Sequence, residues 1–287
     1  MSVTAPATVD AALAALAVPG GADLIAGGTD LMVAVNAGRR ALGPVVAVDR
    51  IAELRRIRHL DDVEGEVVEL GAGVTFTDLL GPDVAPLLPG LTQAARTVGS
   101  PQIRNAGTIG GNLATASPAA DAVPMLVALD ATVVLRSADG GRELPIGDFL
   151  VGPKRTALRP GELITAVRVR VPHGPQEFLK IGTRNAMVIS VCSVAAVADA
   201  DARTVRFGLG SVGPTVLRAP DAEAAAADAI DWAAGSVDAA AAGEVGRLAA
   251  AESRPIDDHR ATAAYRRHCV GVLVERALLR MFPGAGG

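Results

Sequence analysis

Residues 105–121, NAGTIGGNLATASPAAD, form a run of small and polar side chains that a packed core would hardly use. The run has three glycines, two threonines, two asparagines, a serine and a proline, and its only bulky apolar side chains are Ile109 and Leu113. Glycines at 107, 110 and 111 let the backbone come close to a ligand or adopt a positive φ. The run therefore predicts a glycine-rich loop that makes room for something other than core side chains.

Two interpretations of this loop follow from the residue types alone. Thr108, Asn112, Thr115 and Ser117 offer neutral hydrogen-bonding groups, and Asp121 could accept a hydrogen bond from a ribose hydroxyl, which together suit a phosphate-containing ligand. Alternatively, the run is a glycine-rich turn in which Asp121 complements a helix dipole. Ser117 before Pro118 predicts a helix start at that point.

A second glycine pair follows a predicted buried strand. Residues 22–28, ADLIAGG, indicate a strand, residues 29–38 a helix capped by Thr29, and residues 43–50 another strand, so the three predict a small β-α-β unit. Paired glycines between a strand and a helix leave backbone N–H groups free for phosphate. Many such turns use two glycines for steric reasons alone, so this motif by itself names no ligand.

The dinucleotide fingerprint GxGxxG occurs at residues 208–213, GLGSVG, after a predicted strand. The fingerprint binds pyrophosphate only when its glycine turn opens a helix. Here Pro214 and Pro220 bracket β-branched residues, so no long helix is expected to start. A turn between strands is the preferred interpretation.

Composition and charge exclude several classes of protein. The chain has 287 residues, half of them hydrophobic, and a net charge of −4 without a basic cluster, which disfavours nucleic-acid binding. The longest apolar run, residues 188–198, is too short to span a bilayer, and the N-terminus lacks the pattern of a signal peptide. Four separated histidines and two isolated cysteines form no metal-binding spacing and indicate a reduced, cytoplasmic protein.

The order of predicted elements indicates an α+β protein with two domains. Small β/α units fill the first part, whereas the second has three strands followed by alanine-rich helices over 221–234 and 238–252 and a last helix after Pro255, capped by Asp257 or Asp258. The break PHGPQ, residues 172–176, places the boundary so that the domains are 1–174 and 175–287.

Several of these motifs together resemble the FAD-binding medium subunit of the molybdenum hydroxylase family, which includes xanthine dehydrogenase and aerobic carbon monoxide dehydrogenase. The resemblance rests on AGGTDL, GAGVTFTDLL, RNAGTIGGNLATASPAAD, FLKIGTRNAMVISVCSVAAV and the final DDHRATAAYRRHCVGVLVERAL, and it is collinear from about residue 20 to 280. It implies a two-subdomain FAD-binding domain of the PCMH/VAO-like type, followed by a smaller C-terminal α+β domain of the CO dehydrogenase flavoprotein type.

The resemblance also implies which residues contact FAD. The segment that would line the pyrophosphate comprises Leu24, Ile25, Ala26, Gly27, Gly28, Thr29, Asp30 and Leu31. The second loop would contribute Thr108, Ile109, Gly110, Gly111 and Asn112. Asp121 would hold a ribose or ribityl hydroxyl, Lys180 would lie near the flavin, and Ile164 or its neighbour Leu163 would give an apolar contact.

By the same resemblance, the chain is an electron-transfer oxidoreductase subunit without a general acid or base of its own. An iron–sulfur small subunit would carry [2Fe–2S] clusters and a molybdopterin large subunit the molybdenum cofactor, because two isolated cysteines cannot ligate a cluster. The electron acceptor would be NAD⁺, a quinone or oxygen. Two alternatives stay open: a stand-alone FAD-dependent oxidoreductase of the same broader fold, and a non-catalytic interaction subunit that has lost flavin.

Overall fold

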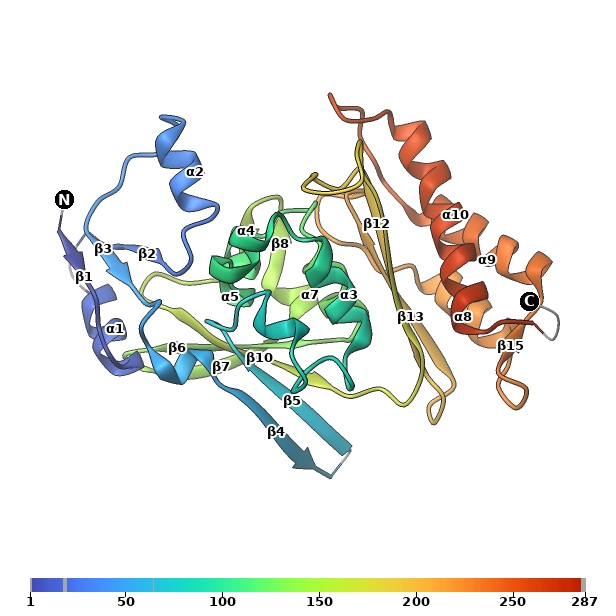
Figure 1. The fold of residues 1–287 in the computed structure, drawn as a ribbon, viewed down its shortest axis with the longest axis horizontal. Coiled ribbons are helices and arrows are strands. Elements are labelled where there is room, and N and C mark those ends of the chain that lie inside the picture. Colours follow the sequence, from blue (N-terminus) through green and yellow to red (C-terminus); the bar gives the residue numbers. More distant parts are fainter. Residues whose placement is uncertain (1, 18–19, 64, 285–287) are drawn as a thin grey trace.

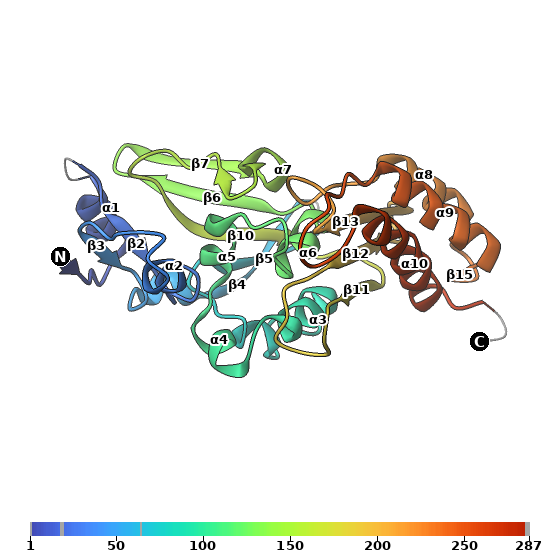
Figure 2. The same cartoon turned by 90° about the horizontal axis from the view of Figure 1, so that it is seen from above.

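The computed structural model describes residues 2–17, 20–63 and 65–284. Figure 1 shows three parts that follow one another along the molecule: an N-terminal unit in blue, a central unit in green, and a C-terminal unit in orange and red. Seen from above, the two ends of the chain lie toward opposite ends of the molecule (Figure 2). The central unit therefore contacts both of the others.

A parallel three-stranded sheet, in the order β1-β3-β2, forms the N-terminal unit. Its elements are β1 (Val3–Thr4), α1 (Val9–Leu16), β2 (Asp23–Ile25), α2 (Leu31–Asn36) and β3 (Val45–Ala47). The predicted β-α-β unit is confirmed, because β2 pairs with β3 in parallel and α2 connects them. Helix α2 begins one residue later than expected, with Asp30 rather than Thr29 at the N-cap position.

An antiparallel five-stranded sheet, in the order β4-β5-β10-β6-β7, forms the central unit. Its strands are β4 (Ile57–Asp62), β5 (Gly65–Gly71), β6 (Thr132–Ser137), β7 (Gly140–Pro145) and β10 (Leu163–Arg170). The helices between β5 and β6 are α3 (Pro89–Thr97), α4 (Pro101–Ala106), α5 (Ile109–Thr115) and α6 (Ala122–Ala128). Short connections are η1 (Ala52–Arg55), η2 (Asp78–Leu80), α7 (Ile146–Phe149), β8 (Leu150–Gly152) and β9 (Arg155–Thr156). One large apolar core joins the inner face of this sheet to α3, α5 and α6.

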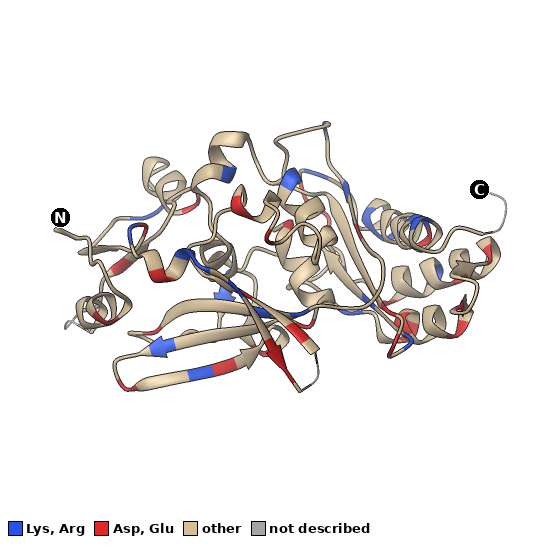
Figure 3. Cartoon of the chain, turned by 60° about the horizontal axis from the view of Figure 1, so that its bottom comes forward, with Lys and Arg blue, Asp and Glu red and all other residues tan. Residues whose placement is uncertain are grey.

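The other face of the central sheet carries charged side chains in cross-strand pairs. Figure 3 shows basic and acidic positions along these strands. Arg58 of β4 and Arg168 of β10 each donate to the Glu69 carboxylate between them, over 2.9 and 2.7 Å. Burial alone would raise the pKa of Glu69, but these hydrogen bonds outweigh it and lower the pKa. The alternating pattern of β10 therefore separates an apolar inner face from a charged outer one.

The C-terminal unit is an antiparallel three-stranded sheet covered on one side by helices. Its elements are β11 (Gln176–Ile181), β12 (Cys192–Asp199), β13 (Thr204–Gly210), α8 (Pro220–Ala229), β14 (Ile230–Asp231), β15 (Ser236–Val237), α9 (Ala239–Glu252) and α10 (Ala263–Met281). Alternate residues of β12 belong to different cores: Val194 packs toward the C-terminal helices, whereas Ala195 packs toward α3 and α6. This two-sided burial explains the unbroken apolar run of β12.

The fingerprint GLGSVG is a turn, as the sequence indicates. It spans the end of β13, and the next helix, α8, begins only at Pro220. A Cβ at Gly208 would lie 2.0 Å from the carbonyl oxygen of Pro124, and one at Gly210 would lie 2.3 Å from Ser193 Oγ. These glycines allow α6 to pack closely on the sheet, so their role is steric.

Two expected helix starts are wrong. Pro118 lies in a turn closed by the Ala120 N–H and the Ser117 carbonyl, and α6 begins at Ala122. The last helix begins only at Ala263, with Thr262 as its N-cap. Of the two expected capping residues, Asp257 accepts a hydrogen bond from the Ala263 N–H, whereas Asp258 is engaged by Arg260 and Arg266. Among the residues that the structure describes, no helix is long and apolar enough to cross a membrane.

Candidate functional site

The loop between β2 and α2 presents a run of backbone N–H groups. Those of Gly27, Gly28, Thr29 and Asp30 have no hydrogen-bond acceptor within the described part of the chain. Gly28 has φ +68°, a left-handed conformation that suits glycine and turns successive N–H groups of a loop to one side. Such a run of unpaired donors fits an anion, since unpaired N–H groups are costly unless water or a ligand satisfies them.

The two glycine loops lie directly against each other. A Cβ at Gly27 would be 1.7 Å from the carbonyl oxygen of Ala106, so only glycine permits this approach. The hydroxyl of Thr115, at the end of α5, donates to Asp30 Oδ2 over 3.3 Å. The structure thus brings together two segments that are about eighty positions apart in the sequence.

Most N–H groups of the second loop are paired within the chain, and only that of Thr108 has no acceptor among the described residues of the loop. Those of Ile109 and Gly110 donate to the carbonyls of Val74 and Ala72, both over 2.9 Å. Thr108 is the N-cap of α5, and its Oγ1 accepts from the Gly111 N–H over 3.1 Å. None of Gly107, Gly110 and Gly111 has a positive φ. This loop therefore differs from the first: all its backbone donors from Ile109 to Asn112 are already used, and the Thr108 N–H and the hydroxyl and amide side chains remain.

Only one close contact within the described part of the chain, to the Thr108 hydroxyl, opposes a side chain at Gly111. Gly111 is exposed, and a Cβ there would meet only Thr108 Oγ1, at 3.1 Å. At Gly110, by contrast, a Cβ would be 2.6 Å from the Ala72 side chain, so packing explains that glycine. The bare surface at Gly111 is therefore available to a ligand.

A buried ion pair lies next to the second loop. Lys180 Nζ, on β11, donates to Asp121 Oδ2 over 2.6 Å, and both side chains are only 8% exposed. Thr97 Oγ1 is 3.0 Å from the same oxygen. Burial raises the pKa of Asp121, and the contacts to Lys180 and Thr97 oppose that rise. Lys180 therefore connects the C-terminal sheet to the loop that carries Asp121.

Two buried oxygen atoms at the site have no partner within the described residues. They are Asn112 Oδ1 and Asp121 Oδ1. Buried polar atoms are nearly always hydrogen-bonded, so each of these oxygens is available to accept a hydrogen bond from water or from a bound ligand.

The apolar candidates lie at different depths. Ile109 is fully buried in the central core, which leaves only its backbone near the loop. Ile164 and Leu163 belong to different cores: Ile164 packs with the central unit, and Leu163 packs with α1 and the residues that follow β3. Leu24, Ile25, Ala26 and Leu31 are partly buried around the first loop.

Two residues next to this site, Thr97 and Arg104, were not among the residues expected from the sequence. Thr97 contacts both Asp121 and Lys180, and Arg104 holds the chain on either side of Thr97. No motif contains Thr97, whose partner Lys180 lies 83 positions away along the chain. Arg104 opens the motif RNAGTIGGNLATASPAAD, but its residue type does not show that it binds the carbonyls that end α3.

Comparison with known proteins identifies the family. Residues 1–173 match the FAD-binding domain in molybdopterin dehydrogenase, and residues 177–281 match the CO dehydrogenase flavoprotein C-terminal domain. The chain belongs to the FAD-binding family of the molybdopterin dehydrogenases. It is an FAD-binding medium subunit of the type found in xanthine and CO dehydrogenases, and so an oxidoreductase flavoprotein.

The relatives of this flavoprotein cover most of its length. The carbon monoxide dehydrogenase medium chain of Hydrogenophaga pseudoflava is 32% identical over an alignment of 295 positions, gaps included, which covers 96% of this chain and 94% of that protein. The nicotinate dehydrogenase FAD-subunit of Eubacterium barkeri is 41% identical over 174 residues, which cover 58% of this chain and 57% of that protein.

Solved structures share the whole fold. The carbon monoxide dehydrogenase of Hydrogenophaga pseudoflava superimposes with a TM-score of 0.86 at 29% identity, covering 98% of this chain and 96% of that one. Quinoline 2-oxidoreductase from Pseudomonas putida 86 gives a TM-score of 0.87 at 25% identity, with the same coverage of both chains.

The residues of this flavoprotein fit FAD. The unpaired N–H groups of the first loop and the bare surface of Gly111 suit a diphosphate, which amide donors can hold without a basic cluster. The orphaned oxygens of Asn112 and Asp121 suit hydroxyl donors of the kind that a ribose or ribityl chain carries.

Proposed function

We propose that this flavoprotein passes electrons from [2Fe–2S] clusters of a partner subunit to NAD⁺, a quinone or oxygen, as part of a multi-subunit molybdenum hydroxylase. Its iron–sulfur partner would be a small subunit, and a molybdopterin large subunit would oxidise the substrate. The names of the relatives support this assignment, because they are medium chains or FAD-subunits of dehydrogenases. Cys192 and Cys269 are both buried and free, so neither is placed to hold a cluster at the surface.

The observation that carries the proposal is the set of four unpaired N–H groups at Gly27–Asp30, held against the second loop. In this proposal they bind the FAD diphosphate, and Leu24, Ile25, Ala26 and Leu31 shape the loop that presents them. Thr108, Gly110 and Gly111 form the opposite wall, with Ile109 anchoring it in the core.

The hydroxyl groups and the ring of FAD would contact the second half of the site. Asn112 and Asp121 would accept from hydroxyl groups through the oxygens that now lack partners. Lys180 would oppose the rise that burial causes in the pKa of Asp121 and would place its ammonium group near the flavin. Ile164 would contribute an apolar contact from the start of β10.

Bound FAD supplies the electron-transfer chemistry, since it exchanges one or two electrons and the protein provides placement and electrostatics. The chain's own part is to bind and orient. The buried ion pair of Lys180 and Asp121 places two opposite charges at fixed positions. The apolar core of the central unit excludes water from the inner side of the site. No residue is assigned as a general acid or base.

The domain boundary and the location in the cell belong to the same proposal. The domain boundary at 174/175 falls between β10 and β11 and between the two matched ranges, 1–173 and 177–281. A cytoplasmic location agrees with two free thiols, which persist in reducing compartments.

The test is the visible absorption spectrum of the co-expressed complex and of the isolated chain, after incubation with FAD and desalting. We expect a bound-flavin spectrum in the complex, together with iron and molybdenum in the co-purified subunits. A complex without flavin would overturn the assignment. A flavin-loaded chain that turns over a small molecule alone, without metal-containing partners, would support a stand-alone oxidoreductase instead.

A further inference from the structure

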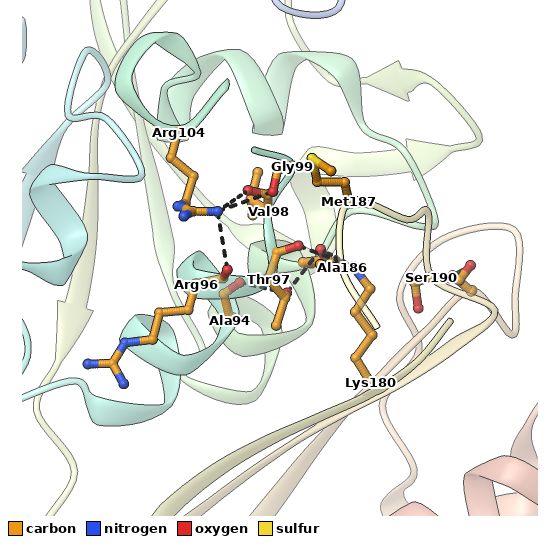
Figure 4. A network of polar contacts seen from close by, with 12 residues as sticks. Ala94, Arg96, Thr97, Val98, Gly99, Arg104, Lys180, Ala186, Met187 and Ser190 are labelled. Carbon is orange, nitrogen blue, oxygen red and sulfur yellow. Dashed lines mark hydrogen bonds and ion pairs between the residues drawn. The ribbon is translucent and has the colours of Figure 1, made fainter. Parts of the chain in front are cut away.

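The end of helix α3 is held by one arginine from the next helix. Arg104 Nη1, on α4, donates to the carbonyl oxygens of Val98 and Gly99, both over 3.1 Å, and lies 3.4 Å from the Arg96 carbonyl (Figure 4). The last carbonyls of a helix lack partners inside the helix, so this guanidinium satisfies groups that would otherwise need water. It also fixes the backbone on both sides of Thr97.

Thr97 itself contacts both members of the buried ion pair. Its Oγ1 is 2.8 Å from the Ala94 carbonyl oxygen and 3.0 Å from Asp121 Oδ2, so its one hydrogen is shared between two acceptors. Its carbonyl oxygen is 3.4 Å from Lys180 Nζ. Figure 4 shows Thr97 at the end of α3 beside the Lys180 side chain. One residue therefore bridges an acid from the second loop and a lysine from the C-terminal sheet.

The arrangement leaves the two oxygens of Asp121 in different states. Oδ2 accepts a hydrogen bond from Lys180 Nζ over 2.6 Å and faces the Thr97 hydroxyl, whereas Oδ1 has no hydrogen-bond partner within the described residues. A carboxylate pinned through one oxygen cannot rotate freely, so its other oxygen keeps one direction. Capping of α3 explains Arg104 by itself, but it does not explain why the Thr97 hydroxyl meets Asp121.

We propose that Thr97, held in place by Arg104, is a positioning residue that orients Asp121 and Lys180 so that Asp121 Oδ1 accepts a hydroxyl group of FAD. This inference rests on the proposed FAD site and goes beyond it, because neither Thr97 nor Arg104 is among the residues that the site was expected to use. Thr97 acts through Asp121 and needs no contact with the cofactor.

The test compares Thr97→Val, which keeps the shape and removes the hydroxyl, with Thr97→Ser, which keeps the hydroxyl. The dissociation constant for FAD is measured by fluorescence titration, the reduction potential of the bound flavin by dye equilibration, and the melting temperature without FAD by calorimetry. We expect Thr97→Val to weaken FAD binding by up to about tenfold, the full effect of losing one hydrogen bond to a charged group, because Thr97 shares its hydrogen between Ala94 and Asp121. Thr97→Ser should stay near wild type.

A double-mutant comparison separates positioning from general stability. If Thr97 acts through Asp121, adding Thr97→Val to Asp121→Asn should weaken FAD binding little further, because both changes remove the same contact. Arg104→Gln should act in the same direction as Thr97→Val and be non-additive with it.

Three results would overturn the inference. They are unchanged FAD affinity and potential in Thr97→Val, additive effects with Asp121→Asn, and a loss of affinity in Thr97→Ser equal to that in Thr97→Val. A wild-type chain and complex that both refuse FAD would be a different result, since it would overturn the proposed function first and this inference with it.

Discussion

The substitution Gly111→Ala separates FAD binding from folding. Gly111 is exposed and lies in the first turn of α5, where a Cβ would meet only Thr108 Oγ1 at 3.1 Å. Replacing a helical glycine by alanine stabilises a helix by about 0.5–1 kcal/mol, and a small shift of the Thr108 hydroxyl offsets part of that gain. We expect the FAD-free variant to be unchanged or up to about 1 kcal/mol more stable than wild type.

FAD binding should move in the opposite direction. The added methyl group would occupy the space in which the diphosphate approaches α5, opposite the N–H groups of Gly27–Asp30. Displacing a phosphate oxygen from one such donor loses about 1.5–3 kcal/mol, which corresponds to about 10- to 100-fold in the dissociation constant. The larger Gly111→Val should abolish FAD retention.

The assay is thermal unfolding of the FAD-free chain and FAD titration on the same preparation. Gly110→Ala is the control, because its Cβ would lie 2.7 Å from the Ala72 carbonyl oxygen and should lower stability directly. If Gly111→Ala folds normally and binds FAD as tightly as wild type, the diphosphate does not lie at Gly111. If its affinity falls only in proportion to its stability, the glycine has a structural role.

Two further predictions concern the C-terminal unit. Gly208→Ala should destabilise the chain by about 2–3 kcal/mol, since its Cβ would lie 2.0 Å from the Pro124 carbonyl oxygen. The folded fraction should bind FAD with wild-type affinity, and a loss of affinity at equal stability would contradict a steric role for this glycine. Burial alone would raise the pKa of Asp258, but hydrogen bonds from Arg260 and Arg266 lower it below its ordinary range. A carboxyl whose pKa is lowered by folding stabilises the folded state at pH values above its unfolded-state pKa near 4, and this stabilisation is lost as the pH falls through the folded-state pKa. Asp258→Asn should therefore lower the free energy of unfolding by about 2 kcal/mol at pH 7 and by progressively less in acid, measured by urea unfolding at several pH values. An equal loss at all pH values would contradict the ion pair.

The local sequence was enough to predict the elements that depend on near neighbours. Period-two alternation predicted β10, and the prolines after GLGSVG predicted a turn without a helix. Strand, glycine pair and helix followed in order at residues 22–38, which is why the β-α-β unit could be foreseen. These features depend on φ, ψ and side-chain periodicity over a few residues.

Helix starts were harder to predict, because a capping residue can be drawn away by a distant partner. Asp258 has the residue type of an N-cap, yet its carboxylate is bound by Arg260 and Arg266, and Thr262 caps α10 instead. Likewise, Ser117 and Pro118 form a turn, and α6 begins after Asp121, whose side chain bonds Lys180 rather than the helix.

The sequence by itself determined that two glycine loops exist, which residues they contain and which family they resemble. Only the tertiary structure decided that Gly27 touches Ala106, that most of the free N–H groups belong to the first loop, and that Thr97 joins Asp121 to Lys180. The physical reason is that a residue's type limits which hydrogen bonds its side chain can make, whereas its partner depends on which distant segments the fold brings together, often tens of residues away in the sequence.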